Sequence, residues 1–177
     1  MRICRQAFSA AVARRKKIAA IHKANVFLMT DGLFLECFRE MSKEFPEVQT
    51  EEILIDAFTA LLVRQPEIYD VVVTTNFYGD TLSDLASELS GSLGLAGSIN
   101  ANAETGFCMA QAQHGSAPDI AGKNIANPTS LILSLAMMLK WLGDHRGDMQ
   151  LRDASHLTEI AVDQVLNNPD YLSLIHI

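Results

Sequence analysis

The chain has 177 residues, of which 49% are hydrophobic and 20% are charged, and its formal net charge is −7. This composition fits one globular domain or two small ones, and it excludes a disordered chain because the apolar content is high for so modest a charge. The acidic balance argues against a general nucleic-acid-binding protein.

The first 30 residues are basic, with seven Lys and Arg residues and no acid. Ile3, Ala7, Ala10 and Ala11 are spaced to share one helical face, which predicts an amphipathic helix over residues 2–15. An organelle transit peptide is the alternative, because such peptides are also Arg-rich and poor in acids. We favour the helix, since it runs without a break into the strand-like residues 18–22.

Strands and helices alternate through the rest of the first half. Apolar and β-branched runs predict three strands, at residues 18–22, 52–55 and 71–75. Apolar residues at helical spacing predict three helices, at residues 32–44, 57–64 and 80–90. This alternation indicates an α/β fold with a substantially parallel sheet.

The second half begins differently. Six glycines punctuate residues 91–127, which predicts a long, functional loop region. Two helices are expected after it, at residues 129–142 and 153–167. The longest largely apolar run, residues 131–139, is about half as long as a membrane span, so we expect no membrane segment.

The chain contains three cysteines, Cys4, Cys37 and Cys108, and no CxxC pair. This spacing matches neither a disulfide framework nor a zinc site. A reducing compartment is therefore expected.

Polar side chains follow each of the predicted strands. Lys23 follows the first strand, Asp56 the second, and Asp80 and Asp84 the third. Ligands of open α/β sheets bind outside the carboxyl ends of the strands, so one lysine and three aspartates could converge on one crevice. Asp80 and Asp84 are one helical turn apart, and Mg²⁺ or Mn²⁺ prefers oxygen ligands of this kind.

Simpler interpretations of these residues exist and are favoured by spacing alone. Asp80 and Asp56 would cap the helices that follow them, and Asp84 would be a solvated acid in a first helical turn. Lys23 would be an ordinary surface lysine at the end of a strand and not an acid/base group. Asn25 would be a turn residue after the first strand.

Residues 114–119, with the sequence HGSAPD, form a Gly/Ser/Pro loop with one His and one Asp. An ordinary turn capped by Ser116 or Asp119 is one interpretation, and a phosphate- or ribose-binding loop of backbone N–H groups is the other. No GxGxxG follows a predicted strand, so the Rossmann fingerprint is absent.

Seven segments resemble the isocitrate/3-isopropylmalate dehydrogenase family of β-decarboxylating dehydrogenases. The combination of YGDxLSD with HGSAPDIAGKxIANP, in this order and at family spacing, is highly specific. The resemblance covers residues 2 to about 166 and rests on HKANV (22–26), TDGLFLE (30–36), IDA (55–57), LVRQPEIYDVVVT (62–74), TNFYGDTLSDL (75–85), GSLGLAGSIN (91–100) and HGSAPDIAGKNIANPTSLILSLAMML (114–139).

The resemblance implies the α/β fold of this family, an isopropylmalate/isocitrate dehydrogenase-like fold with αβα layers. Residues 1–90 would form part of the small dimerisation and catalytic domain. Residues 91–177 would form the C-terminal part of the large cofactor-binding domain. The first residue falls inside what resembles a mid-fold helix, so we expect the fold to be incomplete at the N-terminus. Residues 171–177 do not resemble family sequence.

The implied reaction is the NAD-dependent, metal-assisted oxidative decarboxylation of a 2-hydroxy acid that bears a 3-carboxylate. Asp80 and Asp84 resemble the Mg²⁺ or Mn²⁺ ligands of one subunit. Asp56 resembles the ligand that the partner subunit contributes, and Lys23 resembles the catalytic lysine of that same partner. A homodimer with shared active sites is implied.

The resemblance also implies a set of cofactor-binding residues. Asn25 resembles a residue near the nicotinamide, and Asn127 resembles the residue beside the adenine. The adenosine side of the cofactor would meet His114, Gly115, Ser116, Ala117 and Asp119. A carboxylate at Asp119 would accept hydrogen bonds from ribose hydroxyls and repel a 2′-phosphate, which predicts NAD.

The identity of the substrate stays open between isocitrate and 3-isopropylmalate, with homoisocitrate- or tartrate-type members as alternatives. A non-catalytic regulatory subunit is the alternative function, and the presence of Lys23, Asp56, Asp80 and Asp84 favours the enzyme. We expect a cytoplasmic protein, or one of the mitochondrial matrix if the source is eukaryotic. The 177 residues alone are expected to have little or no activity.

Overall fold

The computed structural model describes residues 1–168, which divide into two compact units. Unit 1 runs from Met1 to Leu89, and unit 2 begins at Ser90. Within residues 1–168, no helix is long and apolar enough to cross a membrane. The expectation about residues 171–177 lies outside the described residues.

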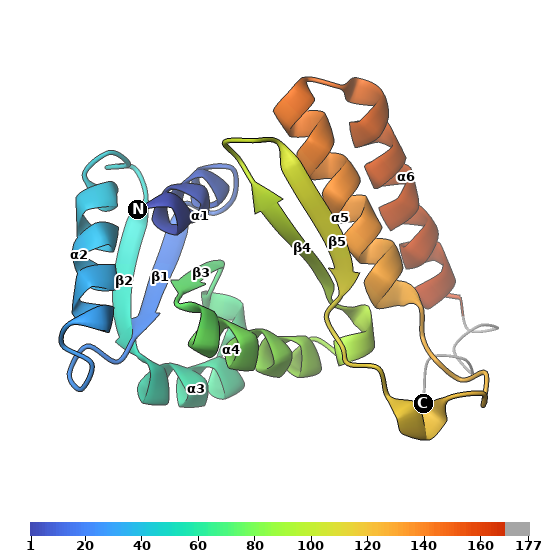
Figure 1. Cartoon of the computed structure of the whole chain (residues 1–177), viewed down its shortest axis with the longest axis horizontal. Helices are drawn as coiled ribbons and strands as arrows, with labels where there is room; N and C mark the ends of the chain where they lie inside the picture. Colours follow the sequence, from blue (N-terminus) through green and yellow to red (C-terminus); the bar gives the residue numbers. More distant parts are fainter. Residues whose placement is uncertain (169–177) are drawn as a thin grey trace. The chain divides into compact units, whose positions relative to one another are not determined.

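A three-stranded parallel sheet forms the centre of unit 1 (Figure 1). β1 (Lys17–His22) lies between β2 (Gln49–Leu54) and β3 (Val71–Thr74) and pairs in parallel with both. Each strand is followed by a helix, because parallel neighbours need a long crossover connection. The predicted α/β fold with a parallel sheet is confirmed.

Helices cover both faces of this sheet. α1 (Arg2–Val12) and α2 (Thr30–Ser42) contribute buried residues to the core on one face. α3 (Ile55–Arg64) and α4 (Asn76–Leu89) contribute to the core on the other face. Unit 1 therefore has the αβα layers expected from the resemblance.

β1 supplies both cores. Ile18 and Ala20 point into the core under α1 and α2, while Ala19 and Ile21 point into the core under α3 and α4. Successive side chains of a strand point to opposite faces, so a strand covered on both faces must be apolar throughout. This requirement explains the uninterrupted apolar run that predicted the strand.

The first turn of α4 is the clearest correction in unit 1. The helix was expected from residue 80, but it begins at Asn76. Asn76 and Gly79, residue types that commonly end a strand in a turn, both lie inside the helix. The chain thus passes from β3 to α4 with only one intervening residue, and Asp80 lies a full turn into the helix.

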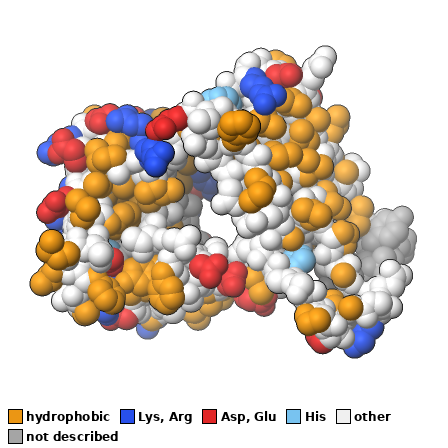
Figure 2. All heavy atoms as spheres, in the orientation of Figure 1, with side chains coloured by type: hydrophobic (Ala, Val, Ile, Leu, Met, Phe, Trp, Pro, Cys, Tyr) orange, Lys and Arg blue, Asp and Glu red, His pale blue; other side chains and the backbone are white. Residues whose placement is uncertain are grey.

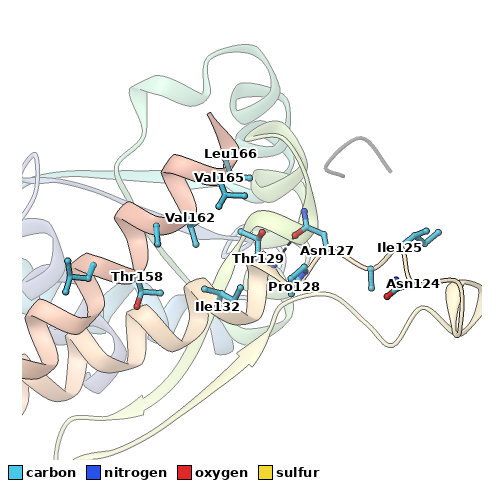
Figure 3. Close-up of a pocket in the computed structure, with 13 residues that line it drawn as sticks. Asn124, Ile125, Asn127, Pro128, Thr129, Ile132, Thr158, Val162, Val165 and Leu166 are labelled. Atoms are coloured by element: carbon cyan, nitrogen blue, oxygen red, sulfur yellow. Dashed lines mark hydrogen bonds between the residues drawn. The ribbon is translucent and has the colours of Figure 1, made fainter. Parts of the chain in front are cut away.

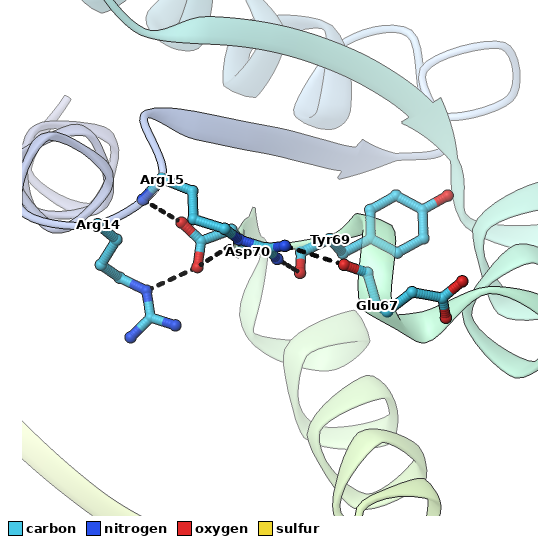
Figure 4. Close-up of polar contacts among 5 residues, drawn as sticks. All are labelled: Arg14, Arg15, Glu67, Tyr69 and Asp70. Atoms are coloured by element: carbon cyan, nitrogen blue, oxygen red, sulfur yellow. Dashed lines mark hydrogen bonds and ion pairs between the residues drawn. The ribbon is translucent and has the colours of Figure 1, made fainter.

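The Asp70 carboxylate joins the segment before β1 to the start of β3 (Figure 4). Only 1% of its side chain is exposed. It accepts hydrogen bonds from Arg14 Nε (2.8 Å) and from the Arg15 backbone N–H (2.9 Å). The Arg15 guanidinium donates in turn to the carbonyls of Glu67 (3.0 Å) and Tyr69. Burial by itself would raise the pKa of Asp70, but the hydrogen bonds from Arg15 and Arg14 outweigh it and lower that pKa.

Replacement of Asp70 by alanine is expected to lower the free energy of unfolding by about 1–2 kcal/mol. The substitution removes the carboxylate that the Arg15 N–H and the guanidinium groups of Arg14 and Arg15 share. Both guanidinium groups are exposed to solvent, which limits the loss of stability. Urea denaturation at neutral pH measures the difference. Glu44→Ala is the control, because Glu44 pairs with Arg5 (2.8 Å) at an exposed site and should matter little.

The sign of the pH dependence follows from the lowered pKa of Asp70. Its stabilising contribution is fully present above the unfolded-state pKa of about 3.9 and is lost as the pH falls through the lower folded-state value. The difference in unfolding free energy between wild type and Asp70→Ala should therefore shrink as the pH falls from about 6 toward 2. A difference that stays constant would contradict the assigned role.

Unit 2 contains a β-hairpin that sequence analysis did not predict. β4 (Gly97–Asn102) and β5 (Phe107–Ala112) pair antiparallel within the stretch expected to be loop. Asn102 Oδ1 accepts the backbone N–H groups of Glu104 (3.0 Å) and Thr105 (3.3 Å), which closes the turn. Gly, Ala and Asn have low strand propensity, so the local pattern did not indicate strands.

Two antiparallel helices follow, α5 (Thr129–Arg146) and α6 (Met149–Leu166). Buried serines on α5 hold the hairpin against it. Ser134 Oγ accepts the Ser98 N–H (2.9 Å) and donates to the Gln111 carbonyl (2.7 Å). A Cβ at Gly97 would lie within 3.2 Å of the α5 backbone, so glycine permits this close approach. Tertiary contacts, and not strand propensity, therefore stabilise the hairpin.

Large apolar side chains stay exposed on unit 2, and Figure 2 shows hydrophobic atoms gathered over its two long helices. Leu131 and Leu135 on α5 and Phe107 and Met109 on β5 are between 44% and 79% exposed. Soluble monomers seldom leave so many large apolar groups uncovered on neighbouring elements.

Candidate active site

The carboxyl ends of β1, β2 and β3 lie at one edge of the sheet in unit 1, because the three strands are parallel. Lys23 directly follows β1, and Asp56 is the second residue of α3, which follows β2. Thr74, the last residue of β3, donates its hydroxyl to the Ile21 carbonyl (2.8 Å). This bond ties the ends of β1 and β3 together, close to where α4 begins.

Lys23 and Asp56 are in direct contact. Lys23 Nζ lies 2.6 Å from Asp56 Oδ1, with 24% of the lysine side chain and 65% of the aspartate side chain exposed. The hydrogen bond from Lys23, aided by nearby backbone N–H groups, lowers the pKa of Asp56. The arrangement places a solvent-reachable amine beside a carboxylate that stays ionised, which suits both proton transfer and cation binding.

Asp80 and Asp84 lie one helical turn apart on α4, and both are exposed. Asp80 is the fifth residue of the helix, so the interpretation of Asp80 as a helix cap is wrong. Leu54 holds the cap position of α3, so Asp56 is a first-turn acid and not the cap residue. Two carboxylates on one helix face can supply two oxygen ligands to a hard divalent cation.

The three aspartates do not gather within one chain. Among the described residues, no group of three or more His, Cys, Asp or Glu side chains could hold a metal ion. Of the lysine and three aspartates that were expected to converge on one crevice, only Lys23 and Asp56 come together. Asp80 and Asp84 form a separate pair on α4.

The loop that follows β5 lines a cavity of about 980 Å³ in unit 2. His114, Gly115, Ser116 and Ala117 all line it, together with residues 92–94 and 124–127. Ala117 adopts a left-handed backbone conformation, with φ of 41°. The Ala117 carbonyl accepts the Ile120 N–H (3.1 Å), which closes the turn at this end of the loop.

Of the three remaining candidate cofactor-binding residues, Asp119, Asn127 and Asn25, only Asn127 lines this cavity. Asp119 lies in the short helix η3 (Pro118–Ile120), is exposed, and is not among the residues that line this cavity. Asn127 lines the cavity, and its Oδ1 accepts the Thr129 N–H (3.0 Å) at the start of α5. Asn25 is exposed in unit 1, two residues after Lys23.

A second cavity, of about 660 Å³, lies between α5, α6 and residues 124–128 (Figure 3). Ile132 from α5 and Val162 and Leu166 from α6 give it a mainly apolar lining. Residues 124–127 line both cavities, so this short segment separates two binding-sized spaces. Sequence analysis identified Asn127 in it but not its neighbours, which carry no chemically distinctive group.

Sequence analysis also missed Asp31. Its side chain is 5% exposed and accepts the backbone N–H of Lys23 at Oδ2 (2.6 Å). The available signal was its position one residue before the predicted helix of residues 32–44, where an acid is commonly read as a cap. No local pattern could indicate that its hydrogen-bond donor is the lysine eight residues earlier.

Comparison with known proteins identifies a single family. The sequence profile of the family described as isocitrate/isopropylmalate dehydrogenase matches residues 1–172. The chain is 50% identical over 140 residues to the chloroplastic 3-isopropylmalate dehydrogenase of Solanum tuberosum, which covers 79% of this chain and 39% of that protein. It is also 50% identical over 140 residues to the mitochondrial NAD isocitrate dehydrogenase catalytic subunit 5 of Arabidopsis thaliana, covering 79% of this chain and 37% of that protein.

Relatives whose names specify NADP match this chain as well. An isocitrate dehydrogenase [NADP] of Rickettsia felis is 49% identical over 149 residues, covering 84% of this chain and 30% of that protein. Among solved structures, isocitrate dehydrogenase from Methylococcus capsulatus superimposes with a TM-score of 0.85 at 47% identity, covering 95% of this chain and 47% of that chain. The present chain thus spans less than half of the length of each of these relatives.

Proposed function

Because the chain belongs to the isocitrate/isopropylmalate dehydrogenase family, we propose that it forms the C-terminal part of an NAD-dependent decarboxylating dehydrogenase. The substrate is a 2-hydroxy acid with a 3-carboxylate, of the isocitrate or 3-isopropylmalate type. The observation that carries this proposal is the Lys23–Asp56 pair at 2.6 Å, at the carboxyl edge of a parallel sheet.

Lys23 is proposed as the acid/base residue. Its amine is partly exposed, so it can reach a substrate, and Asp56 holds it in one place. Oxidation of the hydroxyl group requires removal of its proton, and the enol left after loss of CO₂ requires a proton in return. One positioned amine can serve both transfers, because it takes up a proton in the first step and can give that proton back in the second.

Asp80, Asp84 and Asp56 are proposed as the ligands of Mg²⁺ or Mn²⁺. Carboxylate oxygens are the ligands that these hard cations prefer. A bound cation would act as a Lewis acid on the substrate oxygens. Because no three-ligand cluster forms among residues 1–168, we propose that Asp80 and Asp84 of one subunit meet Asp56 and Lys23 of its partner in a homodimer.

The cavity beside His114 is proposed as the adenosine end of an NAD site. His114, Gly115, Ser116 and Ala117 line it, as Asn127 does. Asp119 lies next to this loop with an exposed carboxylate, which would repel the 2′-phosphate of NADP. Asn25 is proposed to approach the nicotinamide end. The names of the relatives include both NAD and NADP enzymes. The proposal of NAD therefore rests on Asp119.

A reducing compartment is proposed, because Cys4, Cys37 and Cys108 are all free thiols. The cytoplasm is the proposed location, with the mitochondrial matrix as the alternative for a eukaryotic source. The names of the potato and Arabidopsis relatives place those proteins in chloroplasts and mitochondria.

A chimeric enzyme tests the proposed function. Residues 2–168 of this chain are placed behind the N-terminal part of the Methylococcus capsulatus isocitrate dehydrogenase that the chain does not span. We expect isocitrate- and Mg²⁺-dependent reduction of NAD, favoured over NADP by at least about tenfold in kcat/KM. The 177-residue chain alone, the control, should show little or no activity.

Two outcomes would contradict different parts of the proposal. A folded chimera that reduces neither cofactor would overturn the assignment of Lys23 and the aspartates to catalysis. A chimera that prefers NADP would overturn only the role given to Asp119. Circular dichroism and the oligomeric state of the chimera show whether it has folded.

A further inference from the structure

Among residues 1–168, Asp31 is the one buried carboxylate near Lys23 that the proposed mechanism does not use. It is the second residue of α2, and its side chain is 5% exposed. Burying an ionised carboxylate costs free energy unless hydrogen bonds and nearby positive potential compensate. The N-terminus of α2 supplies such potential, and the backbone N–H of Lys23 supplies a hydrogen bond of 2.6 Å.

The backbone of Lys23 is held on both sides. Its N–H donates to Asp31, and its carbonyl accepts the N–H groups of Val26 (2.9 Å) and Phe27 (2.8 Å). The Asp31 N–H donates to the Phe27 carbonyl (3.0 Å), so the turn between β1 and α2 closes on itself. With the backbone held in this way, only the side-chain torsions of Lys23 remain to place its amine.

Asp31 also lies near α4, the helix that carries Asp80 and Asp84. Burial, followed by the negative charge of Asp31 and hydrogen bonding to it, raises the pKa of Tyr78. Tyr78 lies two residues before Asp80 on this helix. The carboxylate of Asp31 is therefore near both the lysine turn and the first turn of α4.

We propose that Asp31 is a positioning residue: its buried carboxylate fixes the Lys23 backbone and thereby sets the Lys23 amine beside Asp56. The inference rests on the proposed function, since Lys23 matters only if it is the acid/base residue. The placement of the Lys23 amine, which this inference predicts, can be measured in a protein that is not catalysing the reaction.

Trace acylation of the folded 177-residue chain measures that placement. Acetic anhydride acylates the neutral form of accessible amines, and mass spectrometry gives the rate at Lys23 relative to Lys43, an exposed reference lysine (71%) whose pair with Glu40 none of the tested substitutions removes. We expect Asp31→Ala to raise this ratio at least about fivefold, the factor that one hydrogen bond typically supports. Asp31→Asn keeps an acceptor oxygen, so its ratio should stay close to that of the wild type.

Asp70→Ala is the matched control. It also removes a buried carboxylate that accepts a backbone N–H beside β1, but from Arg15 at the opposite end of the strand. We expect Asp70→Ala to destabilise the chain and to leave the Lys23 ratio unchanged. An unchanged ratio in Asp31→Ala, or an equal rise in Asp70→Ala, would overturn the positioning role.

A second measurement decides the question if Asp31→Ala does not fold. In the wild-type chain, hydrogen exchange of the Lys23 amide should be slow, because its N–H is bonded to a buried carboxylate. Exchange as fast as that of an exposed amide would overturn the proposal. An inactive chimera with the expected acylation ratios would overturn the proposed function and leave the role of Asp31 standing.

Discussion

Replacement of Lys23 by methionine in the chimeric enzyme is expected to lower kcat by about 10²–10⁴-fold, the range that a general acid/base residue contributes. KM for NAD should change little, because the cofactor loop lies in unit 2 and does not include Lys23. Methionine keeps much of the apolar stem and removes the amine. Steady-state kinetics at saturating isocitrate and Mg²⁺ measures the effect.

A matched substitution separates loss of the amine from loss of a surface charge. Lys43 is 71% exposed and pairs with Glu40 (2.5 Å) on α2, which covers the opposite face of the sheet from α3, the helix of Asp56. Lys43→Met should therefore retain near-normal kcat. Equal losses in Lys23→Met and Lys43→Met, or a kcat of Lys23→Met within a few-fold of wild type, would remove Lys23 from the reaction.

Replacement of Asp80 by asparagine is expected to lower metal-dependent turnover at least about 100-fold, since a Lewis-acid cation contributes several kcal/mol to the transition state. The concentration of Mg²⁺ or Mn²⁺ needed for half-maximal activity should rise, because an amide oxygen binds a hard cation less tightly than a carboxylate. Asp80 is exposed on α4, so folding should be unaffected. Metal titrations followed by activity give both quantities.

Glu88→Gln provides the control for Asp80→Asn, since it makes the same change of charge two turns further along α4. It should leave the metal requirement unchanged. Near-normal activity of Asp80→Asn in Mg²⁺ would exclude Asp80 from the metal site.

Mixing the two inactive chimeras tests the shared site directly. In a heterodimer of Lys23→Met with Asp80→Asn, one of the two sites would combine an intact Lys23 with an intact Asp80. Random reassociation would then restore up to about a quarter of wild-type activity, because about half of the dimers are mixed and each has one intact site. No recovery in demonstrably mixed dimers would contradict the sharing of Lys23 and Asp56 with Asp80 and Asp84.

Local patterns predicted the elements of unit 1 well, because the central strand β1 is buried on both faces and the helices turn apolar residues toward the sheet. The continuous burial of β1, whose successive side chains enter the two cores in turn, is a direct consequence of this layering. The hairpin of unit 2 was missed because its stability comes from α5. Ser134 bonds to both strands, and Gly97 permits close packing, so residues about 35 positions apart decide the structure there.

The sequence by itself determined which chemical groups stand at the sheet edge. Strand–helix alternation makes the strands parallel, and parallel strands bring Lys23 and Asp56 to the same edge. Only the tertiary structure decided their partners. The register of β1 on β2 pairs His22 with Leu54, which brings the lysine onto Asp56 and leaves Asp80 and Asp84 as a separate pair. Register and packing depend on burial of whole faces of the sheet, so no local pattern encodes them, and the contact between Asp31 and the Lys23 backbone arises in the same way.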